Sequence, residues 1–210
     1  MAELEPEEQT QPNVEPHEAQ AESDKTQPPV SVMRYETPAE LFEEMPQVAQ
    51  LTMHRPLAGE TALNFLARLR ASTTPEEALT FAAFALKPKI AIWWCYECLR
   101  VAGDELSHEE RHLMELVANW TNYPDNENRY RAMKVALYAP VRTPAVHLGL
   151  AVGWSGGPIG PNDTAQVPPH RTPRAVNTAA LMCLARSGLQ NRSLRLARFI
   201  QIAGDVISTP

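Results

Sequence analysis

Helix signals are strongest in the stretch TPEEALTFAAFAL, which runs from Thr74 to Leu86. It begins as a capping box, in which Thr74 and Glu77 are spaced to bond each other's backbone N–H groups, and it places Pro75 at the first helical position. The apolar residues that follow recur at helical spacing: Ala78, Leu79, Ala82, Ala83 and Leu86. The stretch therefore predicts a helix with one face in a core.

The same start, a capping residue followed by Pro or Glu, recurs at four other places in the chain. Thr37 opens a short helix that runs through Met45, and Ser107 forms a second capping box with Glu110. Further starts lie at Thr143-Pro144 and Thr172-Pro173, and apolar periodicity predicts helices near residues 59–70, 88–102, 125–139 and 191–205, with Asp125 or Asn126 as a cap.

Strand signals are weak, and only Lys89–Trp94 has a length and composition that permit either state. Gly103 and Gly188 stand where helix C-termini belong. We therefore predict an all-α fold, a single compact domain of about eight helices over residues 35–210.

One connection, which begins at Gly153, is much longer than the others. It runs through Trp154-Ser155-Gly156-Gly157 to Val167-Pro168-Pro169-His170. Loops of this length are uncommon in compact domains and often carry function, and a tryptophan is suited to anchor one. The candidate partner-binding residues are therefore Trp154, Ser155, Gly156 and Gly157. A plain structural crossover is the alternative.

Residues 1–34 differ in composition from the rest of the chain. Residues 1–30 contain eight acidic residues and one basic residue, five prolines, no glycine and no aromatic residue. Such a segment buries too little apolar surface to offset the entropy of ordering, so we expect residues 1–34 to form a disordered acidic tail. The other 180 residues are nearly neutral, which excludes a broadly basic nucleic-acid binder.

Other features bear on the location of the protein. The longest strongly apolar run, Ile90–Cys95, is far shorter than the roughly 18 residues of a membrane span. The N-terminus has no basic start followed by an apolar stretch, so we expect no signal peptide, and three cysteines do not make a disulfide framework. We expect a cytoplasmic protein without a membrane partner.

The segment His108-Glu109-Glu110-Arg111-His112 matches the HExxH pattern of zinc peptidases. Two histidines four residues apart can share Zn²⁺, with Glu109 as general base. However, Ser107 as a helix cap places His108 in the first turn, where acidic residues are favoured by the helix dipole alone. No convincing third ligand follows, so a zinc hydrolase is only an alternative.

Cys95 and Cys98 form a Trp-Cys-x-x-Cys motif like that of thiol oxidoreductases. That chemistry needs a preceding strand and a thiolate at a helix N-terminus, whereas the surroundings here are predicted to be helical. On one helix, both cysteines are small packing residues. A thiol oxidoreductase and a zinc site at these cysteines are kept as weaker alternatives.

Two further features could contact a partner. Trp93 and Trp94 are adjacent on a predicted helix, so one belongs in the core and the other nearer the surface, and Trp94 is named as a contact candidate. Arg192 and Arg195 lie on the basic side of the last helix. A solvated face explains them, and docking onto an acidic partner or onto the acidic tail is the alternative.

Several motifs occur together and in order over residues 57–205. They are Ile90-Ala91-Ile92-Trp93-Trp94, Glu127-Asn128-Arg129, Ala132-Met133, Thr143-Pro144-Ala145, Trp154-Ser155-Gly156-Gly157 and Val167-Pro168-Pro169. In this respect the chain resembles a bacterial all-helical domain family of unknown function, some of whose members are encoded near type VI secretion genes. The resemblance implies a helical fold and an accessory role, and it supplies no catalytic residue.

The sequence therefore predicts a non-enzymatic protein-interaction module. Its expected role is that of an adaptor or chaperone-like accessory protein of a bacterial secretion or effector system, with another protein as partner and neither cofactor nor metal. An immunity-type protein that binds a toxin is one alternative. The zinc hydrolase at His108, Glu109 and His112 is the other.

Overall fold

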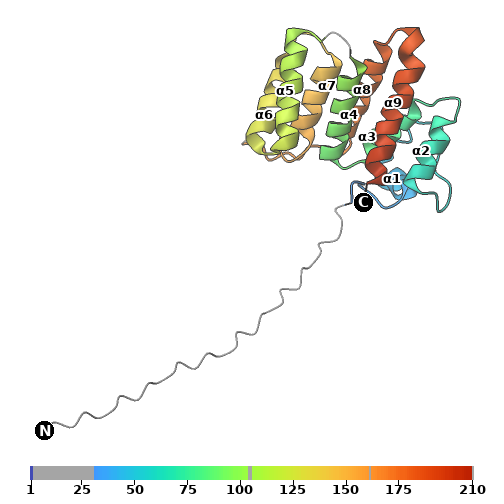
Figure 1. Ribbon diagram of the computed structural model, residues 1–210, viewed down its shortest axis with the longest axis horizontal. Coiled ribbons are helices and arrows are strands. Elements are labelled where there is room, and N and C mark those ends of the chain that lie inside the picture. Colours follow the sequence, from blue (N-terminus) through green and yellow to red (C-terminus); the bar gives the residue numbers. More distant parts are fainter. Residues whose placement is uncertain (2–30, 104–105, 161, 210) are drawn as a thin grey trace.

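The computed structural model describes residues 1, 31–103, 106–160 and 162–209 (Figure 1). Within these residues the chain forms nine α-helices and no β-strand beyond two isolated bridges, so the predicted all-α class is confirmed. The helices are α1 (Pro38–Glu44), α2 (Ala62–Arg70), α3 (Glu77–Ala85), α4 (Pro88–Ala102), α5 (His108–Asn122), α6 (Asn126–Tyr138), α7 (Pro144–Trp154), α8 (Arg171–Ala185) and α9 (Leu189–Ser208).

The helices pack around two that are apolar on nearly every side. Every residue of α3 is buried, as are nine of the eleven residues of α7. Figure 1 shows α5, α6 and α7 together at one end of the molecule, α4 and α8 in the middle, and α9, α3, α2 and α1 at the other end. Since a helix that is apolar all round must be covered on all sides, α3 and α7 organise these two ends.

Several predicted helix ends are confirmed. The capping box of Ser107 and Glu110 is present in full, and Thr37, Asp125 and Thr143 each accept a hydrogen bond from a first-turn N–H group. Gly103 ends α4 in the left-handed conformation, with φ of 65°. Lys89–Trp94, the ambiguous segment, is helical.

Other predicted ends were wrong. The Thr74 hydroxyl donates to the Glu77 carboxylate at 2.7 Å instead of accepting from the backbone, and α3 begins only at Glu77. Thr172 is buried inside α8, which begins one residue earlier without a side-chain cap. Gly188 precedes α9 with φ of −56°, so it is not a left-handed C-terminal residue.

The N-terminal boundary also differs from the prediction. Residues 2–30, which make up most of the predicted disordered tail, lie outside the described residues. Residues near the predicted boundary at 34 pack against the domain, because the backbone N–H of Arg34 donates to Ala85 and Met33 forms a bridge with Leu86. The folded part therefore begins a few residues before 35.

Helices α6 and α7 approach each other closely because of two glycines spaced four residues apart. A Cβ atom at Gly149 would lie 2.9 Å from Cβ of Ala136, and one at Gly153 would lie 2.5 Å from Cγ of Met133. Helix α7 continues through Gly153 to Trp154, and the long connection begins at the next residue, Ser155. The predicted start of this loop at Gly153 was wrong, because the glycine serves helix packing here and does not end the helix.

Candidate protein-binding surface

The long connection after α7 is held by one buried arginine of α6. Arg129 is 3% exposed, and its Nη1 atom donates to the carbonyl oxygen of Gly153 at 2.7 Å. Its Nη2 atom donates to the carbonyl oxygen of Pro158 at 3.0 Å, and Nε donates to Oδ1 of Asn126 at 3.2 Å. A positive charge at the C-terminal end of α7 is also favoured by the helix dipole. Arg129 thus joins α6, α7 and the loop.

The predicted loop residues occupy different environments. Trp154 is half-buried against the core, and the Arg171 guanidinium lies over its ring at 5.7 Å from the centroid. The Ser155 hydroxyl donates to the carbonyl oxygen of Val152, while Gly156 and Gly157 are exposed. The loop is therefore anchored at its start, and beyond Trp154 it presents backbone and small side chains.

Trp94 does not form part of any surface. It is fully buried, and its indole N–H donates to the carbonyl oxygen of Phe199 in α9 at 3.1 Å. Its neighbour Trp93 is 40% exposed. The prediction of Trp94 as a contact residue was therefore wrong. A buried indole needs an acceptor for its N–H group, and Trp94 has one in the core.

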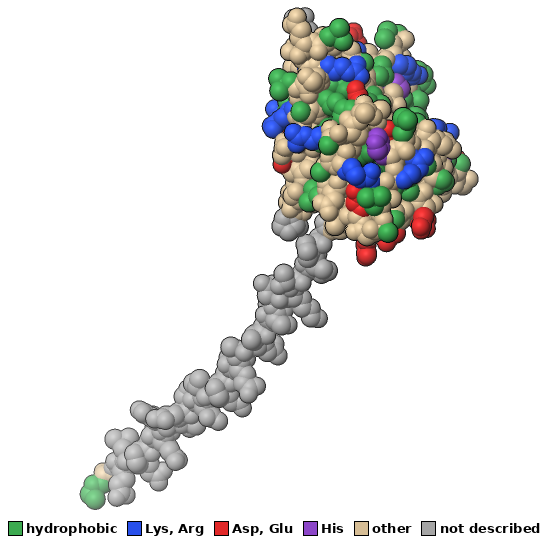
Figure 2. Space-filling view, turned by 90° about the vertical axis from the view of Figure 1, so that its right-hand side faces the viewer, with side chains coloured by type: hydrophobic (Ala, Val, Ile, Leu, Met, Phe, Trp, Pro, Cys, Tyr) green, Lys and Arg blue, Asp and Glu red, His purple; other side chains and the backbone are tan. Residues whose placement is uncertain are grey.

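The two arginines named in the last helix make contacts within the domain. Arg192 forms an ion pair with Glu76 at 3.1 Å, and Arg195 donates to the Ser187 hydroxyl at 2.9 Å. Both are half-buried. Figure 2 shows the end of the molecule that carries α2 and α9, where basic side chains are scattered between hydrophobic ones and do not form a continuous patch. The contacts of Arg192 and Arg195 join α9 to the start of α3 and to the end of α8.

An apolar surface that the sequence analysis did not name lies at the opposite end of the molecule. Two hollows of about 610 and 390 Å³ share Val135 and Tyr138 as lining residues, and together they form what we call the α5–α6 groove. Its lining consists of Ser107, Glu109, Glu110, His112, Leu113, Leu116, Arg131, Lys134, Val135, Tyr138, Ala139, Pro140, Val141, Thr143 and Val146.

The rim of the α5–α6 groove exposes large apolar side chains. Tyr138 is 82% exposed and Val141 is 64% exposed, and Leu137 beside them is also exposed. Buried Leu113 and Val146 lie in the lining between them. Contiguous exposed apolar surface of this kind marks interaction sites more often than single exposed residues do.

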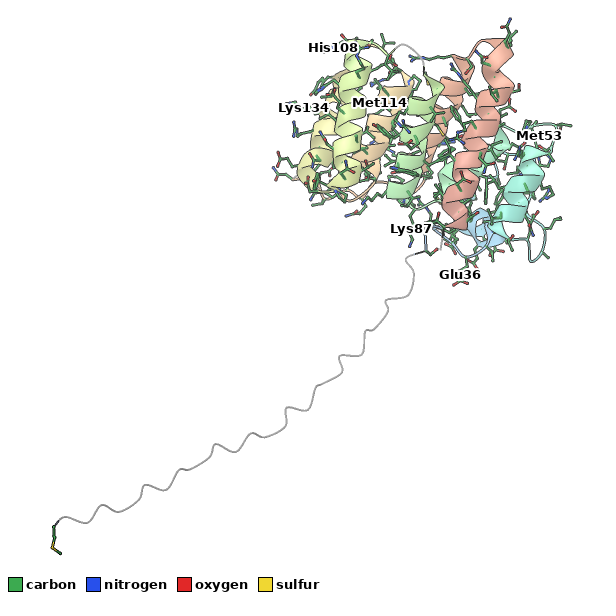
Figure 3. The ribbon with its side chains drawn as sticks, in the orientation of Figure 1. Glu36, Met53, Lys87, His108, Met114 and Lys134 are labelled. Atoms are coloured by element: carbon green, nitrogen blue, oxygen red, sulfur yellow. The ribbon has the colours of Figure 1, made fainter. Side chains whose placement is uncertain are left out.

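The sequence held a weak signal for this groove. Tyr138 fits the apolar periodicity of its helix together with Ala132, Met133, Val135 and Ala136, a pattern that is typical of a buried face. In the structure it belongs to an outward stripe with Arg131 and Lys134, spaced three and four residues apart, and Figure 3 shows Lys134 at the outer edge of α6. A count of apolar residues does not reveal which of two adjacent faces a helix buries.

The HExxH segment does not assemble a metal site. His108 and His112 are both exposed, and Nδ1 of His112 lies 3.8 Å from the Glu115 carboxylate. Glu109 accepts a hydrogen bond from Ser107, which lowers its pKa. In the described ranges, no three His, Cys, Asp or Glu side chains are grouped to hold a metal ion. The segment is the first turn and a half of α5, with His108 at its start (Figure 3).

The cysteines pack in the core. Cys95 and Cys98 of α4 and Cys183 of α8 are all buried and reduced. Burial raises the pKa of the Cys95 thiol well above its ordinary value, and nearby Cys183 adds to the effect. The pKa of Cys98 is raised for the same reasons. A reactive thiolate needs the opposite environment, so these thiols serve packing.

The fold defines the class of protein as an all-helical domain. Among the described helices, none has the length and apolar character needed to cross a membrane. The chain belongs to a family of unknown function (DUF6931), whose family model matches residues 65–207. The match begins inside α2 and ends inside α9, so it contains the α5–α6 groove and the anchored loop. Neither the curated proteins nor the solved structures include a match.

Proposed function

We propose that this protein is a non-enzymatic interaction module that binds another protein through the α5–α6 groove. The observation that carries the proposal is the exposure of Tyr138 and Val141 above an apolar floor that contains Leu113 and Val146. Burying such side chains against a partner removes apolar surface from water, at roughly 25 cal/mol per Å². The rim therefore supplies both binding free energy and shape.

The rigidity of this end of the domain supports the proposal. The groove is formed by helices that are locked together, because Arg129 ties α6 to α7 and the ion pair of Glu110 with Arg186, at 2.7 Å, ties α5 to α8. A preformed groove loses little conformational entropy on binding. The role that suits it is that of an adaptor or chaperone-like accessory protein, and we place that role in a bacterial secretion or effector system.

The proposal is tested by purifying the tagged protein from its own cells and identifying bound proteins by mass spectrometry. Tyr138→Ala and Val141→Asp are the groove variants. Tyr123→Ala is the matched control, since Tyr123 is 70% exposed at the other end of α5 and lines no part of the groove. A partner retained by the control and lost in both groove variants supports the proposal. No specific partner with the wild-type protein contradicts it.

The same experiment examines the anchored loop. Trp154→Ala removes the indole between the loop and Arg171. Loss of the partner in this variant alone, with full retention in the groove variants, would move the binding surface to Trp154, Ser155, Gly156 and Gly157. An immunity-type protein would be recognised by a captured partner that is itself toxic when expressed without this chain.

A further inference from the structure

We infer that the occupant of the α5–α6 groove is an amphipathic helix with an apolar face and an acidic flank, supplied by the partner protein. The inference rests on the proposed function and names the chemistry of the partner. It is argued from the shape of the groove and from the unbalanced charge of its α6 side.

The shape of the groove suits a helix. The smaller hollow lies between α5 and α6, and the larger one continues from it to the α6–α7 turn and Val146 of α7. Val135 and Tyr138 line both hollows. A helix that lies in the furrow between two helices places residues spaced three and four apart into it, which is the usual way in which an amphipathic segment docks. The α5 residues that line the furrow run from Glu109 to Leu116, a stretch of roughly 12 Å at about 1.5 Å per residue.

The α6 side of the groove carries positive charge without a matching carboxylate. Arg131 and Lys134 are exposed lining residues, and neither forms an ion pair or a hydrogen bond through its side chain in the described part of the chain. Arg142, beside the α6–α7 turn, donates to the carbonyl oxygens of Ala136 and Leu137. These hydrogen bonds cap α6, and no carboxylate of the described residues forms an ion pair with Arg142.

The α5 side differs in charge. It carries Glu109 and Glu110 at its start, but the Glu110 carboxylate is paired with Arg186 and the Glu109 carboxylate accepts from Ser107. A bound helix is therefore oriented, with its acidic residues over Arg131 and Lys134 and away from Glu109. Complementary charge of this kind sets partner choice and register more than affinity.

The chain's own acidic segment is a poorer occupant. Residues 1–30 hold eight acidic residues, but their large apolar residues are few and separated, namely Met1, Leu4, Val14 and Val30. Only Met1 and Leu4 are three residues apart, so the segment lacks the repeated spacing of three and four that a row of apolar side chains along the furrow requires. Five prolines within the same segment also oppose a helix.

The test is selection of peptides from a display library of random sequences of roughly 15 residues, which is about four turns of helix and enough to span the lined stretch of α5. The full chain is the target, and Val141→Asp is the counter-target. We expect the enriched peptides to have apolar residues three and four apart and an excess of Asp and Glu. Enrichment of neutral or basic peptides, or equal enrichment on Val141→Asp, would overturn the inference.

The charge is tested separately with the peptides so selected. The double variant Arg131→Glu, Lys134→Glu should weaken their binding about tenfold and remove most of its dependence on salt. The matched control is Lys89→Glu with Arg174→Glu, which reverses two exposed cations outside the groove and should leave binding unchanged. Equal weakening by the two double variants would overturn the inference.

Two other occupants have their own signatures. If replacement of the acidic residues in 1–30 by glutamine in the full chain strengthens peptide binding, the chain's own segment occupies the groove. If Tyr138→Ala converts a dimer to a monomer in sedimentation, a second copy occupies it. Either result overturns the inference. Capture of a partner from cells that nevertheless shows no acidic helix would leave the proposed function standing and reject only the partner's chemistry.

Discussion

Arg129 donates to the carbonyl oxygen of Gly153 at 2.7 Å, although the two residues lie on different helices. The contact is buried and charged on the donor side only, which is among the stronger kinds of hydrogen bond in proteins. It lies at Gly153, where α7 packs closely against Met133 of α6, just before the long connection begins. One guanidinium thus fixes helix packing and the loop together.

Replacing Arg129 by alanine should lower the free energy of unfolding by about 2–3 kcal/mol, because buried carbonyl groups lose their charged donor. Urea denaturation measures the change. Arg131→Ala is the control, since Arg131 is exposed and should change stability by no more than about 0.5 kcal/mol. Equal effects of the two substitutions would contradict the assigned role of Arg129.

Much of the helical architecture could be predicted from the sequence because helix starts are local. Ser107 with Glu110, Thr37, Asp125 and Thr143 act within four residues of themselves, and the structure confirms each cap. The predictions failed for helix ends that depend on contacts with other helices. A buried threonine at 172 looks like a cap in the sequence, and only its tertiary surroundings place it inside α8.

The candidate site was harder to predict for the same reason. Which of the two adjacent tryptophans enters the core depends on α9, whose Phe199 carbonyl accepts the Trp94 indole N–H. The exposure of Tyr138 depends on how α5 and α7 cover α6. Helix α9 is far from Trp94 in sequence, and although α5 and α7 flank α6 along the chain, the periodicity within α6 does not show which of its faces they cover.

Gly153→Ala should destabilise the fold by about 1–3 kcal/mol, because the added methyl group would lie 2.5 Å from Cγ of Met133. Thermal or urea unfolding measures the loss. Gly156→Ala is the matched control, because no atom lies within 4 Å of a Cβ built there.

The clash can be assigned to one neighbour by a double-mutant cycle. Met133→Gly removes Cβ, Cγ and Sδ of Met133, which lie 2.6, 2.5 and 2.7 Å from a Cβ built at Gly153, so Gly153→Ala should cost less in that background than in the wild type. A coupling of zero would show that the glycine is required for its backbone conformation or for helix contacts other than the one with Met133.

Glu77 should make the free energy of unfolding depend on pH in the acidic range. Burial alone would raise the pKa of this carboxyl group, but hydrogen bonds from the His54 backbone and side chain and from the Thr74 hydroxyl outweigh it, so the pKa is lowered from 4.5. A lowered pKa in the folded state means that the stabilisation is complete above about pH 4.5. It is lost as the pH falls through the folded-state value.

The measurement is the free energy of unfolding of wild type and Glu77→Gln between about pH 7 and pH 3. The variant should be less stable at neutral pH by on the order of 1 kcal/mol, and the difference should shrink towards pH 3 as the wild-type carboxylate is protonated. Glu44→Gln, an exposed position on α1, should show no such convergence. A constant difference across the range would mean that Glu77 acts through packing alone.

The three cysteines should resist thiol reagents in the native protein. All are buried, and burial raises the pKa of Cys95 and Cys98 well above the ordinary thiol value, so little thiolate exists at neutral pH. Alkylation by iodoacetamide, followed by mass spectrometry, should be slow in buffer and rapid in denaturing urea. Modification in buffer should therefore follow the opening of the core. Rapid alkylation of Cys95 in native protein at neutral pH would contradict the packing role and restore a thiol oxidoreductase as a candidate.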